Sequence, residues 1–146
     1  MTRQALTTAA IAASAMLTIT ACDAISIFLP QGNVTIRLVN ASSFAVDGVL
    51  YYGDDQQLPD LLLTELGTEV TFNITAGQTR TLVLPCDDVQ AVIIDNANLQ
   101  VLVGLGPDAN TDGLRDGSDF SCGDTIVYTF SHSEVILDFD IDTDVQ

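Results

Sequence analysis

The stretch DANTDGLRDGSD, residues 108–119, carries oxygen-bearing side chains at spaced positions, which suits a hard cation. Calcium takes about six to eight oxygen ligands, and a short loop supplies them only if the chain coils around the ion. The candidate ligands are the side chains of Asp108, Asn110, Asp112, Asp116 and Asp119 and the backbone carbonyl of Leu114. Gly113 stands where such a loop turns sharply. The stretch is therefore a candidate structural calcium site, with no part in catalysis.

Position by position, this stretch resembles the calcium loop of EF-hand proteins and, because its last residue is Asp119 instead of Glu, more closely the loop of dockerins. Two features depart from those families. Arg115 occupies a position where an apolar residue usually packs, and the flanks VLVGLG and FSCGDTIVY indicate strands instead of helices. The residues favour, ahead of calcium, a hairpin loop whose carboxylates face water and in which Arg115 pairs with a neighbouring Asp, since Asp and Gly are common in loops for conformational reasons.

Other residues offer weaker chemistry. His132 is the only histidine and precedes Ser133, so a small extracytoplasmic hydrolase is the enzymatic alternative, although no G-x-S-x-G nucleophile elbow is present. We expect no catalytic residue. Asp138, Asp140 and Asp142 alternate along a predicted strand, where like charges form a solvated face that discourages pairing at a sheet edge.

The first 22 residues, MTRQALTTAAIAASAMLTITAC, have one positive charge at Arg3 and then an uncharged, mostly apolar run. This predicts a secretory signal peptide over residues 1–21. The junction Ile19-Thr20-Ala21-Cys22 resembles a bacterial lipobox. The resemblance implies that Cys22 is lipidated, with residues 22–32 as the lipidated N-terminus and connector. The alternative is an ordinary cleaved signal peptide. Each buried methylene of an acyl chain adds about 0.8 kcal/mol to membrane binding.

The chain has three cysteines, an odd number for an exported protein. Lipidation of Cys22 removes the odd one and leaves Cys86 and Cys122 to form a disulfide bond. If successive strands reverse direction, both cysteines fall at the same end of a sandwich. The bond would then contribute roughly 3 to 4 kcal/mol in the chain-entropy model. A reactive thiol or a metal ligand is the competing interpretation.

The net charge of -16 excludes one class of partner. Every Asp and Glu follows Cys22, where the only basic residues are Arg37, Arg80 and Arg115. Without a basic patch the chain cannot neutralise phosphates, so we expect no nucleic-acid binding. Anionic membrane surfaces repel it too, which leaves solubility or attraction for cations and basic partners as the roles of the charge.

Alternating patterns predict an all-β fold. NVTIRLVN places Val34, Ile36 and Leu38 on one face, and TEVTFNIT and SEVILDFDI repeat the pattern. With the other β-rich segments this gives an antiparallel β-sandwich of about eight strands over residues 33–146. PDLLLTELG predicts one short helix that caps the core. The arrangement resembles the immunoglobulin-like or fibronectin-like sandwich class, which implies a fold and no function.

The sequence therefore predicts an exported lipoprotein, held by its N-terminal lipid on the extracytoplasmic side of a cell-envelope membrane. Its domain is expected to be a non-catalytic binding or structural module without a cofactor, apart from the possible calcium ion. A calcium-stabilised adhesion module is the second alternative beside the hydrolase. Neither the membrane leaflet nor a protein or glycan partner follows from the residues.

Overall fold

A computed structural model describes residues 32–101, 106–133 and 138–146; the predicted signal peptide, Cys22 and the connector up to residue 31 lie outside the described residues. The described residues form nine strands, one α-helix and one 3-10 helix. The strands are β1 (Asn33–Asn40), β2 (Val46–Gly53), β3 (Thr68–Ile74), β4 (Thr79–Pro85), β5 (Ala91–Leu99), β6 (Asp108–Ala109), β7 (Leu114–Arg115), β8 (Thr125–His132) and β9 (Phe139–Val145). The helices are α1 (Asp60–Leu66) and η1 (Cys86–Asp88).

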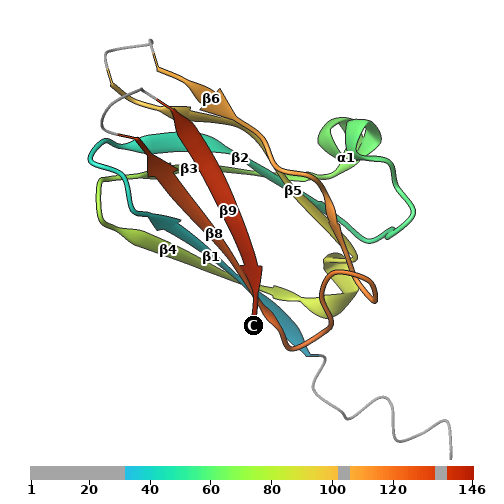
Figure 1. Cartoon of the computed structure of the whole chain (residues 1–146). Helices are drawn as coiled ribbons and strands as arrows, with labels where there is room; N and C mark the ends of the chain where they lie inside the picture. The colour runs from blue at the N-terminus through green and yellow to red at the C-terminus, as the bar shows by residue number, and fades with distance from the viewer. Residues whose placement is uncertain (1–31, 102–105, 134–137) are drawn as a thin grey trace, which may run out of the picture. The chain divides into compact units, whose positions relative to one another are not determined.

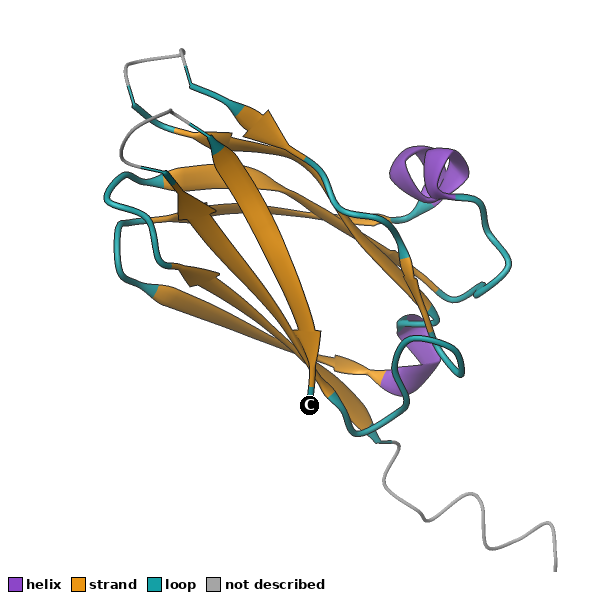
Figure 2. Cartoon of the chain, in the orientation of Figure 1, coloured by secondary structure: helices purple, strands orange, loops and turns teal. Residues whose placement is uncertain are grey.

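The strands form two facing sheets, which confirms the predicted all-β sandwich with one short α-helix (Figures 1 and 2). One sheet has the order β4-β1-β8-β9, and the other has the order β3-β2-β5-β6 with β7 also pairing with β5. All pairs are antiparallel except β1 with β8, which run parallel. The first two strands lie in opposite sheets, whereas in an immunoglobulin constant domain they share one.

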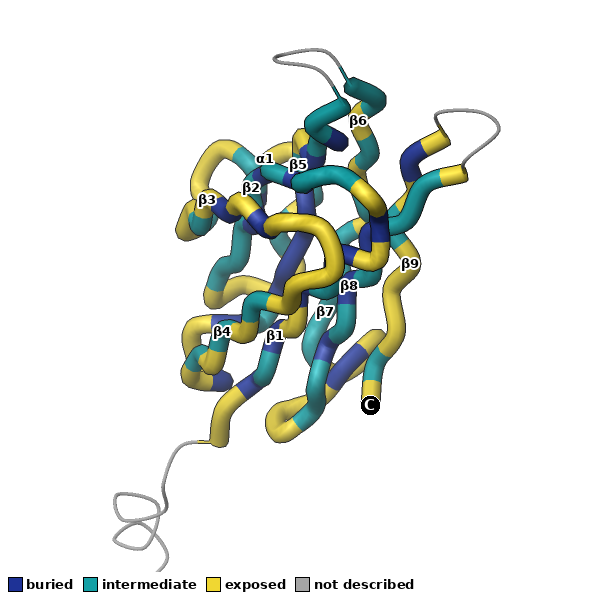
Figure 3. Tube along the Cα trace, turned by 90° about the vertical axis from the view of Figure 1, so that its left-hand side faces the viewer, coloured by how far each residue is buried: buried dark blue, intermediate teal, exposed yellow. Residues whose placement is uncertain are grey.

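The inward face of β1 is the one that its sequence predicts. Val34, Ile36 and Leu38 are all buried, and each contributes about 1.5–3 kcal/mol relative to an exposed position. The same alternation buries Phe130 on β8, in the same sheet as β1, and Leu50 on β2, in the facing sheet. Figure 3 shows buried positions along the strands, and exposed ones both in the connections and along the edge strand β9.

The alternation breaks once, in β5. Val92 and Ile94 face the core, but further along the strand the buried residues are Ala97 and Leu99. Asn96, with φ at 51°, adopts the left-handed conformation that Asn tolerates better than most residues. The extra residue shifts the register against β2 between Asp47 and Val49. This bulge keeps the second half of β5 pointing into the core.

The first connection is held by a buried side chain, Asn40 at the end of β1. Its amide nitrogen donates to the carbonyls of Phe44 and Ile74, both at 2.8 Å. Its carbonyl oxygen accepts from the backbone N–H of Ser42 at 2.9 Å and from the Ser42 hydroxyl at 2.6 Å. One side chain therefore ties the β1–β2 loop to the end of β3, in the opposite sheet.

Tyr128 in β8 is fully buried, and its hydroxyl has no hydrogen-bond partner among the described residues. Tyr128→Phe is therefore expected to raise the free energy of unfolding by about 1–2 kcal/mol, because it removes a buried, unsatisfied polar group and keeps the ring. Urea denaturation measures the change. The half-exposed Tyr52 is the control, and Tyr52→Phe should change stability by no more than about 0.5 kcal/mol. Destabilisation by Tyr128→Phe would contradict this reasoning.

Burial also raises the pKa of the Tyr128 hydroxyl above its usual value. The folded state therefore disfavours the ionised phenol. The contribution of Tyr128 to stability is complete below about pH 10, the pKa of an unfolded tyrosine, and declines as the pH rises beyond it. The Tyr128→Phe variant should lose this part of the alkaline destabilisation.

Helix α1 packs differently from the sequence prediction. The helix follows Pro59 and ends at Gly67, whose N–H donates to the Leu63 carbonyl at 2.9 Å. Only Leu63 is buried, in a small cluster with Ala91 and Ile93 that is separate from the core between the sheets. The predicted cap over the core is therefore wrong, because α1 covers the outer face of β5. No helix among the described residues has the length and apolar character needed to cross a bilayer.

Candidate functional site

Two parts of the stretch from Asp108 to Asp119 pair with β5 in the second sheet, and its last residues form a turn. Asp108 in β6 lies opposite Asn98, and Leu114 in β7 lies opposite Val92. At about 3.4 Å per strand residue, these two positions are about 20 Å apart, whereas calcium ligands lie about 2.3–2.6 Å from their ion. The structure therefore does not gather the six predicted ligands around one point. They are Asp108, Asn110, Asp112, Leu114, Asp116 and Asp119.

Arg115, which departs from the calcium-loop pattern, forms a salt bridge with Asp60 at the start of α1. Its guanidinium also donates to the carbonyls of Leu58 at 2.8 Å and Leu114 at 3.1 Å. The other Asp60 oxygen accepts from the Gly113 N–H at 3.1 Å. The loop is thus fastened to the helix by a residue far away in the sequence.

Asp119, the predicted last ligand, has a local role. Its carboxylate accepts from the backbone N–H of Arg115 at 2.8 Å and from the Ser118 hydroxyl at 3.1 Å. Its own N–H donates back to the Arg115 carbonyl at 2.9 Å. These bonds close the tight turn around Gly117, whose φ is 77°.

Part of the stretch does meet the acidic strand β9. Asn110, Asp112 and Leu114 line a surface cavity of about 440 Å³ together with Asp140 and Asp142. In the described part of the chain, no group of three Asp, Glu, His or Cys side chains is arranged to hold a metal ion. Calcium binding stays a prediction. Thermal melting with calcium and with a chelator tests it, and an unchanged melting midpoint would show that no calcium ion stabilises the fold.

His132 lies at the end of β8, opposite Phe139. Its ring meets the ring of Phe44 edge-on, with centroids 5.4 Å apart. Its Nδ1 atom is buried and has no hydrogen-bond partner within residues 32–101, 106–133 and 138–146. These contacts give the hydrolase alternative no support, because a catalytic histidine needs a nucleophile within hydrogen-bond reach.

The predicted disulfide is present between Cys86 at the start of η1 and Cys122 in the turn before β8, with the Cα atoms 5.5 Å apart. Gly32, where the described chain enters the domain, lies directly against it. The Gly32 carbonyl accepts from the Cys86 N–H at 3.0 Å. A Cβ at Gly32 would overlap the Cys122 sulfur, so this close approach requires glycine.

Helix α1 exposes one large leucine side chain near each of its ends. Leu61 is 72% exposed and Leu66 is 71% exposed. Together with the cavity at each of them, they form what we term the α1 surface. The sequence signal for this surface is the number of leucines in a helix of only seven residues, because such a short helix cannot turn all of them inward.

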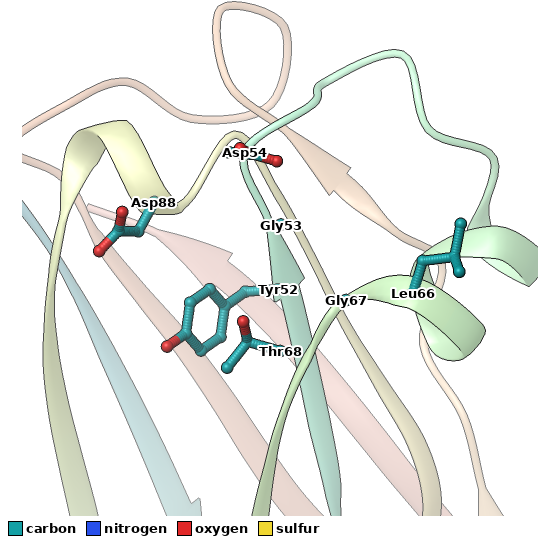
Figure 4. Close-up of a pocket in the computed structure, with 7 residues that line it drawn as sticks. All are labelled: Tyr52, Gly53, Asp54, Leu66, Gly67, Thr68 and Asp88. Carbon is teal, nitrogen blue, oxygen red and sulfur yellow. The ribbon is translucent and has the colours of Figure 1, made fainter.

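The Leu66 cavity lies where β2 ends and β3 begins, and its volume is about 330 Å³ (Figure 4). Figure 4 shows Leu66 on the helix side, with Asp54 and Asp88 on segments across from it. The side chains of Tyr52 and Thr68 form part of the lining between them. One apolar side chain and two carboxylates therefore border one hollow.

The Leu61 cavity, of about 370 Å³, lies between α1, β5 and residues 110–111. It repeats the same composition, with Leu61 beside Asp60 and Asp95. Nearby, burial and then the carboxylates of Glu69 and Asp95 raise the pKa of the Tyr51 hydroxyl. The carboxylates of this region thus produce a negative potential at the outer face of β2 and β5.

No protein-family model matches the chain, and no curated protein matches it. Among solved structures, the domain is similar to the T6SS lipoprotein TssJ1 from Pseudomonas aeruginosa, with 13% identity, a TM-score of 0.42 and coverage of 79% of this chain and 98% of that one. It is also similar to the membrane-binding domain of pneumolysin, with 10% identity, a TM-score of 0.47 and coverage of 78% and 97%. At these TM-scores neither likeness carries a functional argument.

Proposed function

We propose that this chain is an exported lipoprotein, anchored through Cys22 on the extracytoplasmic side of a cell-envelope membrane, and that its sandwich is a non-catalytic binding module. One observation supports this most strongly. Of the three cysteines in the chain, Cys86 and Cys122 are bonded to each other. Cys22 is the remaining thiol, and it stands at the end of the lipobox-like Ile19-Thr20-Ala21.

The entry of the chain into the domain agrees with a short tether. Residues 23–31 span at most about 30 Å when fully extended, at roughly 3.4 Å per residue. They lead to Gly32, which is held against the disulfide. The lipid would therefore keep this end of the sandwich close to the bilayer, and the α1 surface within reach of other envelope proteins.

Intact-mass measurement of the membrane-extracted protein tests the anchor. We expect removal of residues 1–21 and the added mass of a diacylglyceryl group on Cys22, with labelled fatty acid incorporated. Cys22→Ala should abolish both the added mass and the label, because the two cysteines that remain, Cys86 and Cys122, are bonded to each other.

The matched control is Ser26→Ala in the connector, which should be lipidated like the wild type. A wild-type protein with an unmodified Cys22 would refute the anchor. Removal of the leader at Cys22 without lipid would instead identify an ordinary exported protein.

A further inference from the structure

We infer that the α1 surface docks a partner protein through a segment in which apolar side chains are flanked by lysine or arginine. The inference rests on the proposed function, because it names the partner chemistry of the binding module. Its two parts are the exposed leucines at either end of α1 and the carboxylates that border each of them.

The leucines supply the apolar part of the recognition. Leu61 and Leu66 lie five positions apart, which is about 7.5 Å along the helix axis and about 140° around it, so they open onto different sides of α1. Each also lines a cavity that a partner side chain can enter. At interaction sites, apolar anchors of one protein fill pockets on the other.

The carboxylates supply the charge. Asp54 and Asp88 border the Leu66 cavity, and Asp95 borders the Leu61 cavity. The arginines do not neutralise these three. Arg115 is paired with Asp60, and the other arginines of the domain lie on β1 and β4, in the opposite sheet.

Charge complementarity selects the occupant. A second copy of this chain carries the same large negative charge, and an anionic bilayer carries the same sign, so both are repelled. The connector segment DAISIFLPQG has apolar residues but no basic one. A basic, apolar segment of another protein satisfies both the leucines and the carboxylates.

The test uses the full lipidated protein in nanodiscs of neutral phosphatidylcholine. The probe is a fluorescent synthetic peptide in which two leucines are flanked by lysines. Two matched peptides replace either the leucines by serine or the lysines by glutamine. We expect the first peptide to bind and each matched peptide to bind at least about tenfold more weakly, with affinity that falls as salt rises.

Two variants and their controls locate the site. Leu61→Ser with Leu66→Ser should weaken binding at least about tenfold, whereas Val83→Ser, at a residue 61% exposed on β4, should not. Asp54→Asn with Asp88→Asn should weaken binding and reduce its salt dependence. Asp138→Asn with Asp142→Asn, which changes the net charge equally, should have a smaller effect.

Several results would overturn the inference. They are no binding of the leucine–lysine peptide, equal binding of the leucine-free peptide, wild-type affinity in the double-leucine variant, or equal effects of the two carboxylate pairs. Intact mass reports lipidation of the same preparation. A protein recovered without lipid is tested in solution, so failure of the anchor and failure of the docking surface are separate results.

Discussion

Replacing Cys86 and Cys122 together by alanine is expected to lower the free energy of unfolding by about 4 kcal/mol. The bond closes a loop with a sequence separation of 36 residues. In the chain-entropy model, opening it gives the unfolded chain back the corresponding conformational freedom. Because the bond also lies against Gly32, its loss removes packing where the chain enters the domain.

Urea denaturation of the exported protein measures this effect. Reduction of the wild type should reproduce most of the loss, and reductant should leave the double-alanine variant unchanged. The midpoint should fall, while the slope m should rise because the unfolded chain becomes less compact. A loss below about 1 kcal/mol would show that the bond adds little to the stability of the folded sheets.

Asn40→Ala is the second large effect, with an expected loss of about 2–4 kcal/mol. The substitution leaves buried partners of Asn40 without their hydrogen bonds, and unmade bonds at buried polar groups are costly. It also releases the β1–β2 loop from the end of β3, because the hydrogen bond from Asn40 to the Ile74 carbonyl links the two. Weaker protection of the Ser42 N–H from hydrogen exchange should accompany the loss.

Asn73→Ala is the matched control, because Asn73 is an exposed asparagine on β3. It should change stability by no more than about 0.5 kcal/mol. Ser42→Ala removes only part of the network and should fall between the two. If Asn40→Ala and Asn73→Ala lower the free energy of unfolding by the same amount, the buried network does not stabilise the loop.

The strand faces were predictable because a period of two depends only on local sequence. Val34, Ile36 and Leu38 face the core as their alternation indicates. The same pattern does not say which strands are neighbours, so the sheet order and the parallel pairing of β1 with β8 do not follow from it. The all-β sandwich was therefore predictable and its topology was not.

Local patterns do not show which contacts distant residues make. The residue types at 108–119 suit calcium, and calcium binding stays a prediction, but pairing with β5 extends the chain at residues 108–109 and 114–115. Arg115 forms a salt bridge with Asp60, although strands β3 to β6 separate the two residues in the sequence. No local pattern reveals such a contact. Helical periodicity likewise gave no reason to expect that α1 would bury only Leu63 and leave Leu66 exposed.

The position of Gly32 has a mechanical consequence. A pull on the tether enters β1, which lies in the interior of its sheet with β4 on one side and β8 on the other. The load is then applied along the strand, so the hydrogen bonds to both neighbours resist it together instead of opening one at a time. The adjacent covalent bond between Cys86 and Cys122 fixes the segments around that point. With the proposed anchor at Cys22 and the proposed partner at α1, the domain would stay folded while force passes between them.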